Sequence, residues 1–518
     1  MCPPLRDEPR ATAAGQTRPR DPRARSDQPG RRGDRRRGRL PPVVDPRSGH
    51  QRPGGADGRA LADLWRPAGG RKAARGRRPS RGRAGKDCLM ASMLIRGGRV
   101  VDPSQGIDRV ADLLIRDGLV VSIGQTGSQP LGKVDETIDA EGLVVTPGLI
   151  DMHVHLREPG REEDETIETG TRAALAGGFT SVACIPNTEP PIDTQANVEF
   201  IRQKAARADT CNVFVVGCVS RDRAGKELAE IGQLVEAGAV AFSDDGSPVY
   251  DAELMRRAFE YCRMFDKPIL AHEEVLELSR GGVMHEGLVS LSLGLAGMPA
   301  AAEEVMIGRD LALAEVTGGR LHVMHVSTAH GVELIRRAKA AGIRVTAEAC
   351  PHHFTLTDEN LRGFDSNFKM SPPLRTAADV EGILAGLADG TIDCIATDHA
   401  PHAPEKKLLE LDRAPFGILG LETAVGLCVT RLIETGRIGW PRFVDAASRL
   451  PAEILGVNRG TLRPGGVADV TLIDPGLQWR VDAGRFASKS VNSPFHDWTL
   501  TGRAVATIVG GRVKFRLP

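Results

Sequence analysis

Residues 151–160 read Asp-Met-His-Val-His-Leu-Arg-Glu-Pro-Gly, and they follow an apolar run at 143–150 that is typical of a buried strand. Alternate residues of a strand point to the same face, so His153 and His155 are predicted to project together from its carboxyl end. Two neighbouring neutral imidazoles can chelate a borderline metal such as zinc. Arg157 continues the alternation and would add a guanidinium beside the metal. Two histidines spaced like this also occur in ordinary loops, so the metal interpretation requires further ligands elsewhere in the chain.

The net charge of +1 over 518 residues conceals two regions of opposite charge. Residues 1–92 hold 24 Lys and Arg against 9 Asp and Glu, whereas the remainder holds 44 against 58. The first region is rich in Arg, Pro and Gly and lacks apolar periodicity, so we expect a disordered basic extension upstream of the true start at Met93. A nucleic-acid-binding tail or a targeting peptide is the alternative. For the acidic remainder we expect no nucleic-acid binding.

The nine cysteines include no Cys-x-x-Cys pair, and several lie in apolar runs, among them Cys184, Cys218 and Cys394. This pattern favours buried free thiols in a reducing compartment. No apolar run approaches the roughly 18 residues that a membrane helix needs, and no secretory signal is visible. The sequence therefore predicts a soluble, cytoplasmic protein without a membrane partner.

Both ends of the region after Met93 alternate apolar and polar residues, as strands do. Asp117-Gly118 separates two such runs and indicates a hairpin. The runs at 467–474 and 504–513 have the same texture. We therefore predict a small β-sandwich composed of residues 93–148 and 458–518.

Between these ends, apolar strand patterns alternate with helical ones, for example helices at 168–176 and 301–317. Eight such strands with intervening helices predict an α/β fold of the (β/α)₈ TIM-barrel type over residues 149–457. The strand candidates are 143–152, 180–185, 212–219, 239–243, 268–271, 321–326, 344–349 and 393–396.

Polar residues follow most of these strands, at the end where barrels of this type carry their chemistry. A single histidine at a strand end is more often structural, but the set as a whole predicts a metal site. Its members are His153, His155, Asn187, Asp244, Asp245, His272, His325, His352, His353 and Asp398.

This layout resembles the amidohydrolase superfamily and, within it, the class I bacterial dihydroorotase family. The resemblance runs from Met93 to the C-terminus. It rests on His-Leu-Arg-Glu-Pro-Gly, Pro-Asn-Thr-x-Pro, Phe-Ser-Asp-Asp-Gly, Ala-His-x-Glu, Met-His-Val-Ser-Thr, Pro-Pro-Leu-Arg, Thr-Asp-His-Ala-Pro-His and Pro-Phe-Gly-x-x-Gly-Leu-Glu-Thr.

The family implies two zinc ions per subunit. His153, His155 and Asp398 would hold one ion, and His272 and His325 the other. Asp245 would bridge them, with Asp244 as the fallback. Many superfamily members use a carboxylated lysine as the bridge, but no lysine lies at this strand end, which favours a dihydroorotase over a hydantoinase.

The family also implies the reaction, the reversible cyclisation of N-carbamoyl-L-aspartate to L-dihydroorotate in pyrimidine synthesis. Asp398 would be the catalytic acid and base. The substrate contacts would be Arg157, Asn187, Ser371, His402, Phe416 and Gly417. Ser371 departs from the asparagine usual in the family, which changes the hydrogen bonds offered there. The polar segment at 401–415 is long enough to be a mobile lid.

Two alternatives remain at the level of sequence. An allantoinase or hydantoinase would share the fold and metals but should lack Arg157 and Asn187 as an anion pocket. A non-catalytic scaffold subunit should have lost metal ligands, whereas every expected ligand is present. A homodimer and a complex with aspartate transcarbamoylase are the protein partners that the resemblance leaves open.

Overall fold

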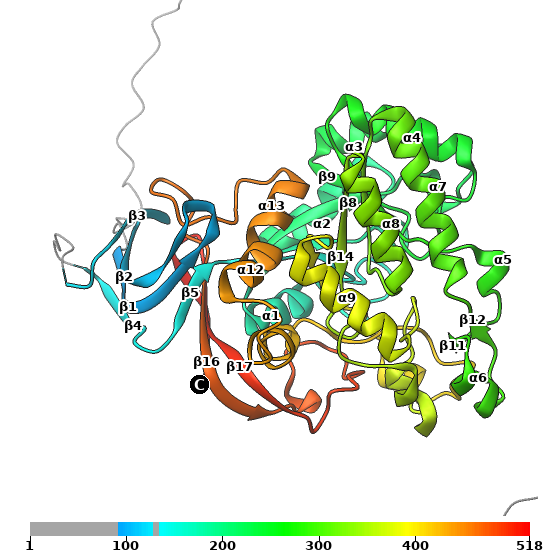
Figure 1. The fold of residues 1–518 in the computed structure, drawn as a ribbon. Coiled ribbons are helices and arrows are strands. Elements are labelled where there is room, and N and C mark those ends of the chain that lie inside the picture. Colours follow the sequence, from blue (N-terminus) through cyan, green and yellow to red (C-terminus); the bar gives the residue numbers. More distant parts are fainter. Residues whose placement is uncertain (1–91, 128–133) are drawn as a thin grey trace, which may run out of the picture. The chain divides into compact units, whose positions relative to one another are not determined.

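The computed structural model describes residues 92–127 and 134–518, shown in sequence colours in Figure 1. The predicted basic extension falls, apart from Ser92, outside these residues. Within the described ranges, no helix combines the length and apolar character needed to span a membrane.

Eight parallel strands form the barrel predicted from the sequence, in the order β15-β14-β13-β10-β9-β8-β7-β6. A parallel bridge between Val154 and His399, with the His155 amide donating to the His399 carbonyl at 3.0 Å, joins the two outer strands. The strands are β6 (Leu149–Val154), β7 (Phe179–Cys184), β8 (Asn212–Gly217), β9 (Ala239–Phe242), β10 (Pro268–Ala271), β13 (Arg320–Val323), β14 (Val345–Ala349) and β15 (Cys394–Ile395).

The predicted first strand, 143–152, is in fact two strands. β5 (Val144–Pro147) belongs to the small sheet, and β6 begins the barrel immediately afterwards. Gly148 lies between them, and a Cβ there would come within 2.0 Å of the Thr180 hydroxyl oxygen. The close approach of the Thr180 side chain explains why the chain crosses from one sheet to the other at a glycine.

Helices follow the barrel strands and cover their outer face (Figure 1). The first shows how their ends are set: Thr166 caps it by accepting from the Thr169 amide, and Gly178 ends it with φ 94°. The helices are α1 (Ile167–Gly177), α2 (Gln195–Ala208), α3 (Ile231–Ala237), α4 (Ala252–Met264), α5 (Leu276–Ser279), α6 (Leu288–Leu293), α7 (Ala301–Thr317), α8 (Ala329–Ala340), α9 (Ala377–Asp389), α10 (Pro404–Lys407), α11 (Ala424–Cys428), α12 (Trp440–Val444) and α13 (Leu450–Leu455).

The two ends of the described chain combine into one eight-stranded mixed sheet, in the order β18-β17-β16-β5-β1-β2-β3, with β4 paired to β1. The predicted hairpin turn has Asp117 and Gly118 at positive φ, and the Val120 amide donates to Gly466 across the edge of the sheet. The remaining strands are β1 (Ser92–Asp102), β2 (Ile107–Arg116), β3 (Leu119–Gly124), β4 (Glu136–Asp139), β11 (Met284–His285), β12 (Gly297–Met298), β16 (Val470–Arg480), β17 (Thr499–Val509) and β18 (Arg512–Arg516).

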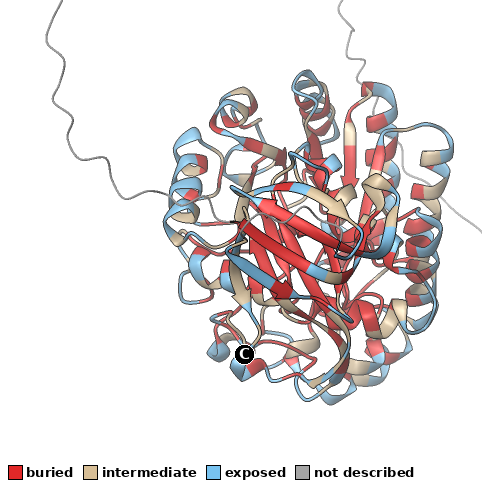
Figure 2. Ribbon diagram, turned by 90° about the vertical axis from the view of Figure 1, so that its left-hand side faces the viewer, coloured by how far each residue is buried: buried red, intermediate tan, exposed pale blue. Residues whose placement is uncertain are grey.

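Burial separates a barrel core from a core in the small sheet. Figure 2 shows buried strands and helices whose outer faces are exposed. In the small sheet, Val100 and Leu113 pack in one cluster with Val470 and Ile508. Because this cluster joins residues from both ends of the described chain, neither end can bury its apolar face alone.

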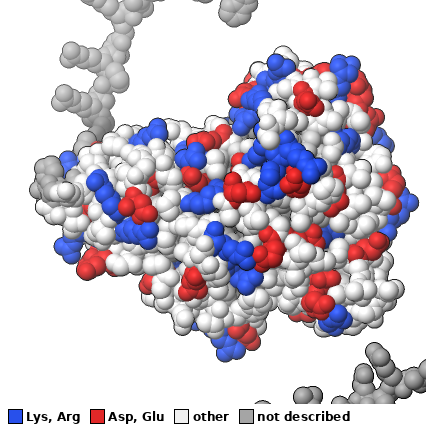
Figure 3. All heavy atoms as spheres, viewed as in Figure 1, with Lys and Arg blue, Asp and Glu red and all other residues white. Residues whose placement is uncertain are grey.

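Charged side chains of both signs lie side by side on the face seen in Figure 3. Exposed ion pairs also occur on α4, where Arg257 pairs with Glu253 and Arg256 pairs with Glu260. Exposed pairs of this kind each stabilise a protein by about 0–1 kcal/mol.

Candidate active site

The first barrel strand carries His153 and His155 into the interior at its carboxyl end, as the strand pattern predicts. His153 is fully buried, and its Nδ1 lies 2.7 Å from Oε1 of Glu348 on β14. His155 Nδ1 lies 2.9 Å from Oδ1 of Asn187. If each Nδ1–H donates to its oxygen, each Nε2 presents a lone pair to the centre of the site.

Asp398, directly after the eighth strand, lies closest to these two nitrogens. Its Oδ1 is 3.3 Å from His153 Nε2 and 2.9 Å from His155 Nε2. Burial raises the pKa of the Asp398 carboxyl, but the two imidazoles outweigh it and hold the pKa below its usual value. The group is therefore an ionised, buried carboxylate.

Asp245 and Asp244 point in different directions. Oδ1 of Asp245 lies 3.3 Å from His272 Nδ1 and 3.6 Å from His325 Nε2, and its Oδ2 lies 3.6 Å from His155 Nε2. Asp244 instead accepts from the backbone amides of Val219 and Ser220. The geometry therefore favours Asp245 over Asp244 for any group shared between the histidines.

His272 and His325 complete the cluster from the fifth and sixth strands. Nδ1 of His272 is 2.8 Å from Nε2 of His325, and Nε2 of His272 is 3.0 Å from Oε2 of Glu274. Burial lowers the pKa of His272, but Asp245 and Glu274 outweigh it and raise the pKa to about 10. Two nitrogens this close share a single proton or a cation.

Three site residues have the left-handed backbone conformation that non-glycine residues rarely adopt. They are Arg157 (φ 60°), His325 (φ 32°) and Asp398 (φ 48°). Such residues cost about 1–3 kcal/mol each and concentrate at functional sites. For Arg157 this also corrects the reasoning from alternation, because β6 ends at Val154 and a sharp turn then redirects the side chain.

The donor set fits a metal centre. His153, His155 and Asp398 offer ligand atoms within 4.8 Å of one another, and so do His153, Asp245 and His325. Nε2 of His153 is buried and has no hydrogen-bond partner among the described residues. An unsatisfied buried nitrogen costs about 1–3 kcal/mol, which a bound cation would remove.

A cavity of about 660 Å³ opens over this cluster. Its walls include the predicted ligands His155, Asp245, His272 and Asp398 and five of the six predicted substrate contacts, which are Arg157, Asn187, Ser371, His402 and Phe416. Gly417 does not line it. Instead the Gly417 amide donates to the Lys369 carbonyl at 2.9 Å.

Arg157 is a buried cation in the cavity wall, 5 % exposed. Its Nε donates to the Pro401 carbonyl at 3.2 Å, which fixes the plane of the guanidinium. Burial and nearby Arg161 lower its pKa to about 10, so the group stays charged at neutral pH. A fixed, desolvated guanidinium suits a carboxylate ligand.

Two lysines stabilise the part of the cavity wall that contains Phe416. Neither was predicted from the sequence. Nζ of Lys369 donates to the carbonyls of Leu411 and Ala414, at 2.7 Å each, and lies 4.5 Å from the Phe416 ring centroid. Nζ of Lys407 donates to the Pro415 and Gly417 carbonyls at 3.0 and 3.1 Å. Leu411, Ala414 and Pro415 belong to the predicted lid at 401–415, and Phe416 follows it directly; the mobility of the lid stays a prediction.

Glu348 was also missed. It bonds His153 and, at 3.1 Å, His322. Burial raises its pKa, but these two histidines outweigh it and lower the pKa to about 2. Its signal in the sequence is a glutamate inside an otherwise apolar strand.

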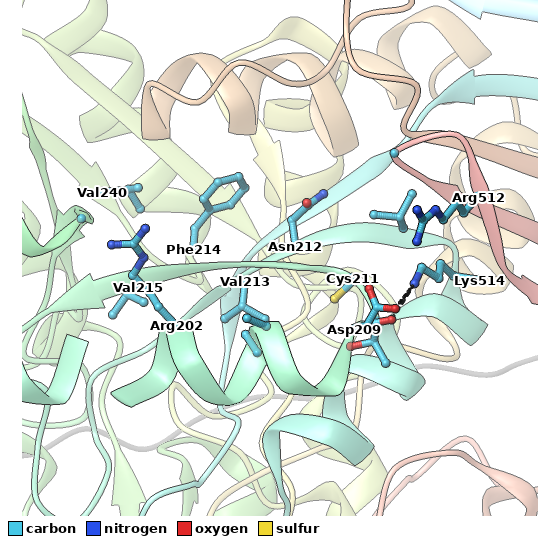
Figure 4. Close-up of a pocket in the computed structure, with 16 residues that line it drawn as sticks. Arg202, Asp209, Cys211, Asn212, Val213, Phe214, Val215, Val240, Arg512 and Lys514 are labelled. Atoms are coloured by element: carbon cyan, nitrogen blue, oxygen red, sulfur yellow. Dashed lines mark hydrogen bonds and ion pairs between the residues drawn. The ribbon is translucent and has the colours of Figure 1, made fainter. Parts of the chain in front are cut away.

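A second large cavity, of about 700 Å³, lies where β8 begins, at the opposite end of that strand from the metal ligands. Figure 4 shows its wall of Val213, Phe214 and Val240 and the ion pair between Lys514 and Asp209 at 2.9 Å. Its lining contains no cluster of histidines and carboxylates, so we place the chemistry at the other end.

The chain is similar to known proteins over most of the described residues. Residues 142–331 match the family described as "Dihydro-orotase-like". A dihydroorotase from Citrifermentans bemidjiense is 54% identical over 82% of this chain and 100% of its own length. One from Pelotomaculum thermopropionicum is 55% identical over 81% of this chain and 98% of its own.

Among solved structures, an L-hydantoinase (dihydropyrimidinase) from Arthrobacter aurescens has a TM-score of 0.74 at 28% identity, covering 82% of this chain and 96% of that one. Its likeness in sequence is about half that of the dihydroorotases. The sequence relatives therefore decide between two families with one fold, and the chain belongs to the dihydroorotase family of the amidohydrolase superfamily.

Proposed function

We propose that this chain interconverts N-carbamoyl-L-aspartate and L-dihydroorotate with the help of two zinc ions. Arg157 is the main support for this substrate, because its buried cation lies in the same cavity wall as the predicted metal ligands. The family relatives support the reaction class, since their printed name is dihydroorotase.

In this proposal His153, His155 and Asp398 hold one zinc ion, His272 and His325 hold the other, and Asp245 is shared. The set of imidazoles and carboxylates suits zinc, and Glu348 and Asn187 would fix the orientation of His153 and His155. When bound, the metals would lower the pKa of a water molecule and polarise the carbonyl that it attacks.

Asp398 moves the proton. In the hydrolytic direction a C–O bond forms at the ring carbonyl and the ring C–N bond breaks. Asp398 accepts the proton of the attacking water and delivers it to the leaving nitrogen. The depressed pKa of the Asp398 carboxyl keeps it ionised before the reaction and favours release of the proton that it accepts. Cyclisation follows the same steps in reverse.

Arg157 holds the substrate's free carboxylate. Its Nε is engaged with Pro401, so its two terminal nitrogens can form a bidentate pair with an anion. Asn187 and His402 flank this position, Phe416 covers the ring, and Ser371 offers one hydroxyl in place of the family's usual amide.

The two alternative functions, a different cyclic amidase and a non-catalytic scaffold, fit the residues of the site less well. A hydantoinase or allantoinase substrate has no free carboxylate that would require a buried guanidinium. A non-catalytic scaffold would not need to keep six metal-ligand side chains together in one buried cluster.

The decisive experiment loads the purified chain with zinc and compares turnover of L-dihydroorotate, allantoin and hydantoin. We expect turnover of L-dihydroorotate alone. Preferential turnover of either other compound would reassign the substrate, and turnover of none by fully loaded protein would favour the scaffold.

The same proposal places the chain in pyrimidine synthesis in the cytoplasm. The seven cysteines among the described residues are all buried and free, which suits a reducing compartment. A homodimer, and a complex with aspartate transcarbamoylase, remain partners to test by mass measurement of the protein alone and with the transcarbamoylase.

A further inference from the structure

The turn after β14 carries a second group of metal-ligand side chains that the proposed reaction does not use. Cys350, His352 and His353 are all buried, and each offers a ligand atom within 4.8 Å of the others. None of the three lines the substrate cavity. They are therefore not substrate contacts, although two of them were noted as strand-end residues in the sequence.

Both imidazoles have a nitrogen without a partner. Nε2 of His352 and Nδ1 of His353 form no hydrogen bond with any described residue, although these histidines are only 1% and 2% exposed. Leaving such atoms unsatisfied costs about 1–3 kcal/mol each. A buried ligand or water is needed to recover that free energy.

His353 has the arrangement typical of a metal-bound histidine. Its Nε2 lies 2.9 Å from the Pro372 carbonyl, which can only accept, so Nε2 carries the proton and Nδ1 presents a lone pair. Metal-ligating histidines usually donate their second N–H to such a carbonyl or carboxylate. Burial and the neighbouring His352 lower the pKa of His353, which keeps the imidazole neutral.

The backbone has already brought the three donors together. The His353 amide donates to the Cys350 carbonyl at 2.9 Å, which closes a four-residue turn, and the two rings are 4.3 Å apart between centroids. A thiolate and two imidazoles are ligands that zinc accepts readily.

We propose that Cys350, His352 and His353 bind a third divalent cation of the zinc type, separate from the catalytic pair. On binding, the Cys350 thiol loses its proton to solvent and a metal–sulfur bond forms. The ion would satisfy both unpartnered nitrogens and fix the turn after β14, where His353 bonds the Pro372 carbonyl next to the cavity residue Ser371. This inference does not rest on the proposed reaction.

Cobalt provides a test, because a thiolate bound to Co²⁺ gives a charge-transfer absorption in the near ultraviolet and none of the proposed catalytic ligands is a cysteine. We expect the Co²⁺-loaded full chain to have this band. Cys350→Ser should abolish the band and lower the metal content by about one ion per chain. The matched control, Cys428→Ser, changes an equally buried thiol on α11 and should keep both.

Two further variants distinguish loss of the third metal site from misfolding and from loss of the catalytic metals. His352→Gln keeps the thiol and should weaken the band, which tests the site even if Cys350→Ser does not fold. Asp245→Ala should lose catalytic metal yet keep the band. Absence of the band in the parent chain, or its persistence in Cys350→Ser, would overturn the proposal and mean that water satisfies the two nitrogens.

Discussion

The barrel has two large cavities of nearly equal volume, about 660 Å³ at the carboxyl ends of the strands and about 700 Å³ at the start of β8. They differ in how their charges are held. In the first, Asp245, Asp398 and Arg157 are at most 5% exposed and face one another or the cavity. In the second, Arg202 donates to the Ala237 carbonyl and Lys514 pairs with Asp209, so those cations are satisfied locally. Concentrated buried charge, more than volume, marks the reactive end.

The largest expected effect is at the shared carboxylate. Asp245→Ala should lower kcat/KM by more than about 1000-fold, equivalent to about 4 kcal/mol, and should release metal, because one side chain faces four histidines. Asp244→Ala is the matched control and should cost about 10-fold with metal retained, since that carboxylate bonds only to the neighbouring strand end. Zinc content and kcat/KM are measured for both variants. If Asp244→Ala lost more zinc and activity than Asp245→Ala, Asp244 would be the shared carboxylate instead.

Arg157 should have the next largest effect. Removing a charge-assisted contact should cost roughly 2–4 kcal/mol of transition-state binding in Arg157→Ala, which is about 30- to 1000-fold in kcat/KM. Arg157→Lys should recover only part, because an ammonium cannot form the bidentate pair. Zinc content should stay unchanged in both. If both variants kept near-native kcat/KM for L-dihydroorotate, Arg157 would not be the group that binds the substrate carboxylate.

The lysines behind Phe416 are expected to hold that part of the cavity wall in place and to take no part in the chemical step. Lys369→Met removes the donor to two buried carbonyls and should raise KM about 10-fold, with little change in kcat or zinc content. Arg413→Met is the control, since that arginine pairs with Glu410 at the surface, and should change KM less than about twofold. A fall in kcat without a change in KM would assign Lys369 a role in the chemical step instead.

The smallest effect is expected at the opposite end of the barrel. Arg512→Ala and Lys514→Ala alter the rim of the second cavity and should leave kcat/KM within about twofold of the parent chain. A larger change in kcat/KM, measured at equal zinc content, would mean that the second cavity also influences the activity at the carboxyl end of the barrel.

The barrel and the order of its site residues were predictable because periodicity and strand ends are local signals. Seven of the eight strands, the hairpin at Asp117-Gly118 and both example helices are where the sequence places them, and the predicted first strand is divided between two sheets. The break at Gly148 was not predictable, because it depends on Thr180, a residue of another strand. Lys369 and Lys407 were missed because their acceptors are backbone carbonyls, which leave no trace in the residue types around them.

Arg157 illustrates a correct location reached by an incomplete argument. Alternation placed it in the cavity, but its left-handed backbone, and not a continued strand, directs the side chain there. A positive φ at a non-glycine residue has no reliable signature in a single sequence.

The small sheet has a consequence for the order in which the chain is made. β5 leaves the ribosome early together with β1 and β2, yet its partner β16 follows about 320 residues later. At ~5–20 residues per second, the early strands wait roughly 15–65 s with one edge and an apolar face uncovered. Uncovered edges of this kind recruit other strands. During synthesis that edge of the sheet therefore stays open to other strands until β16 has been added.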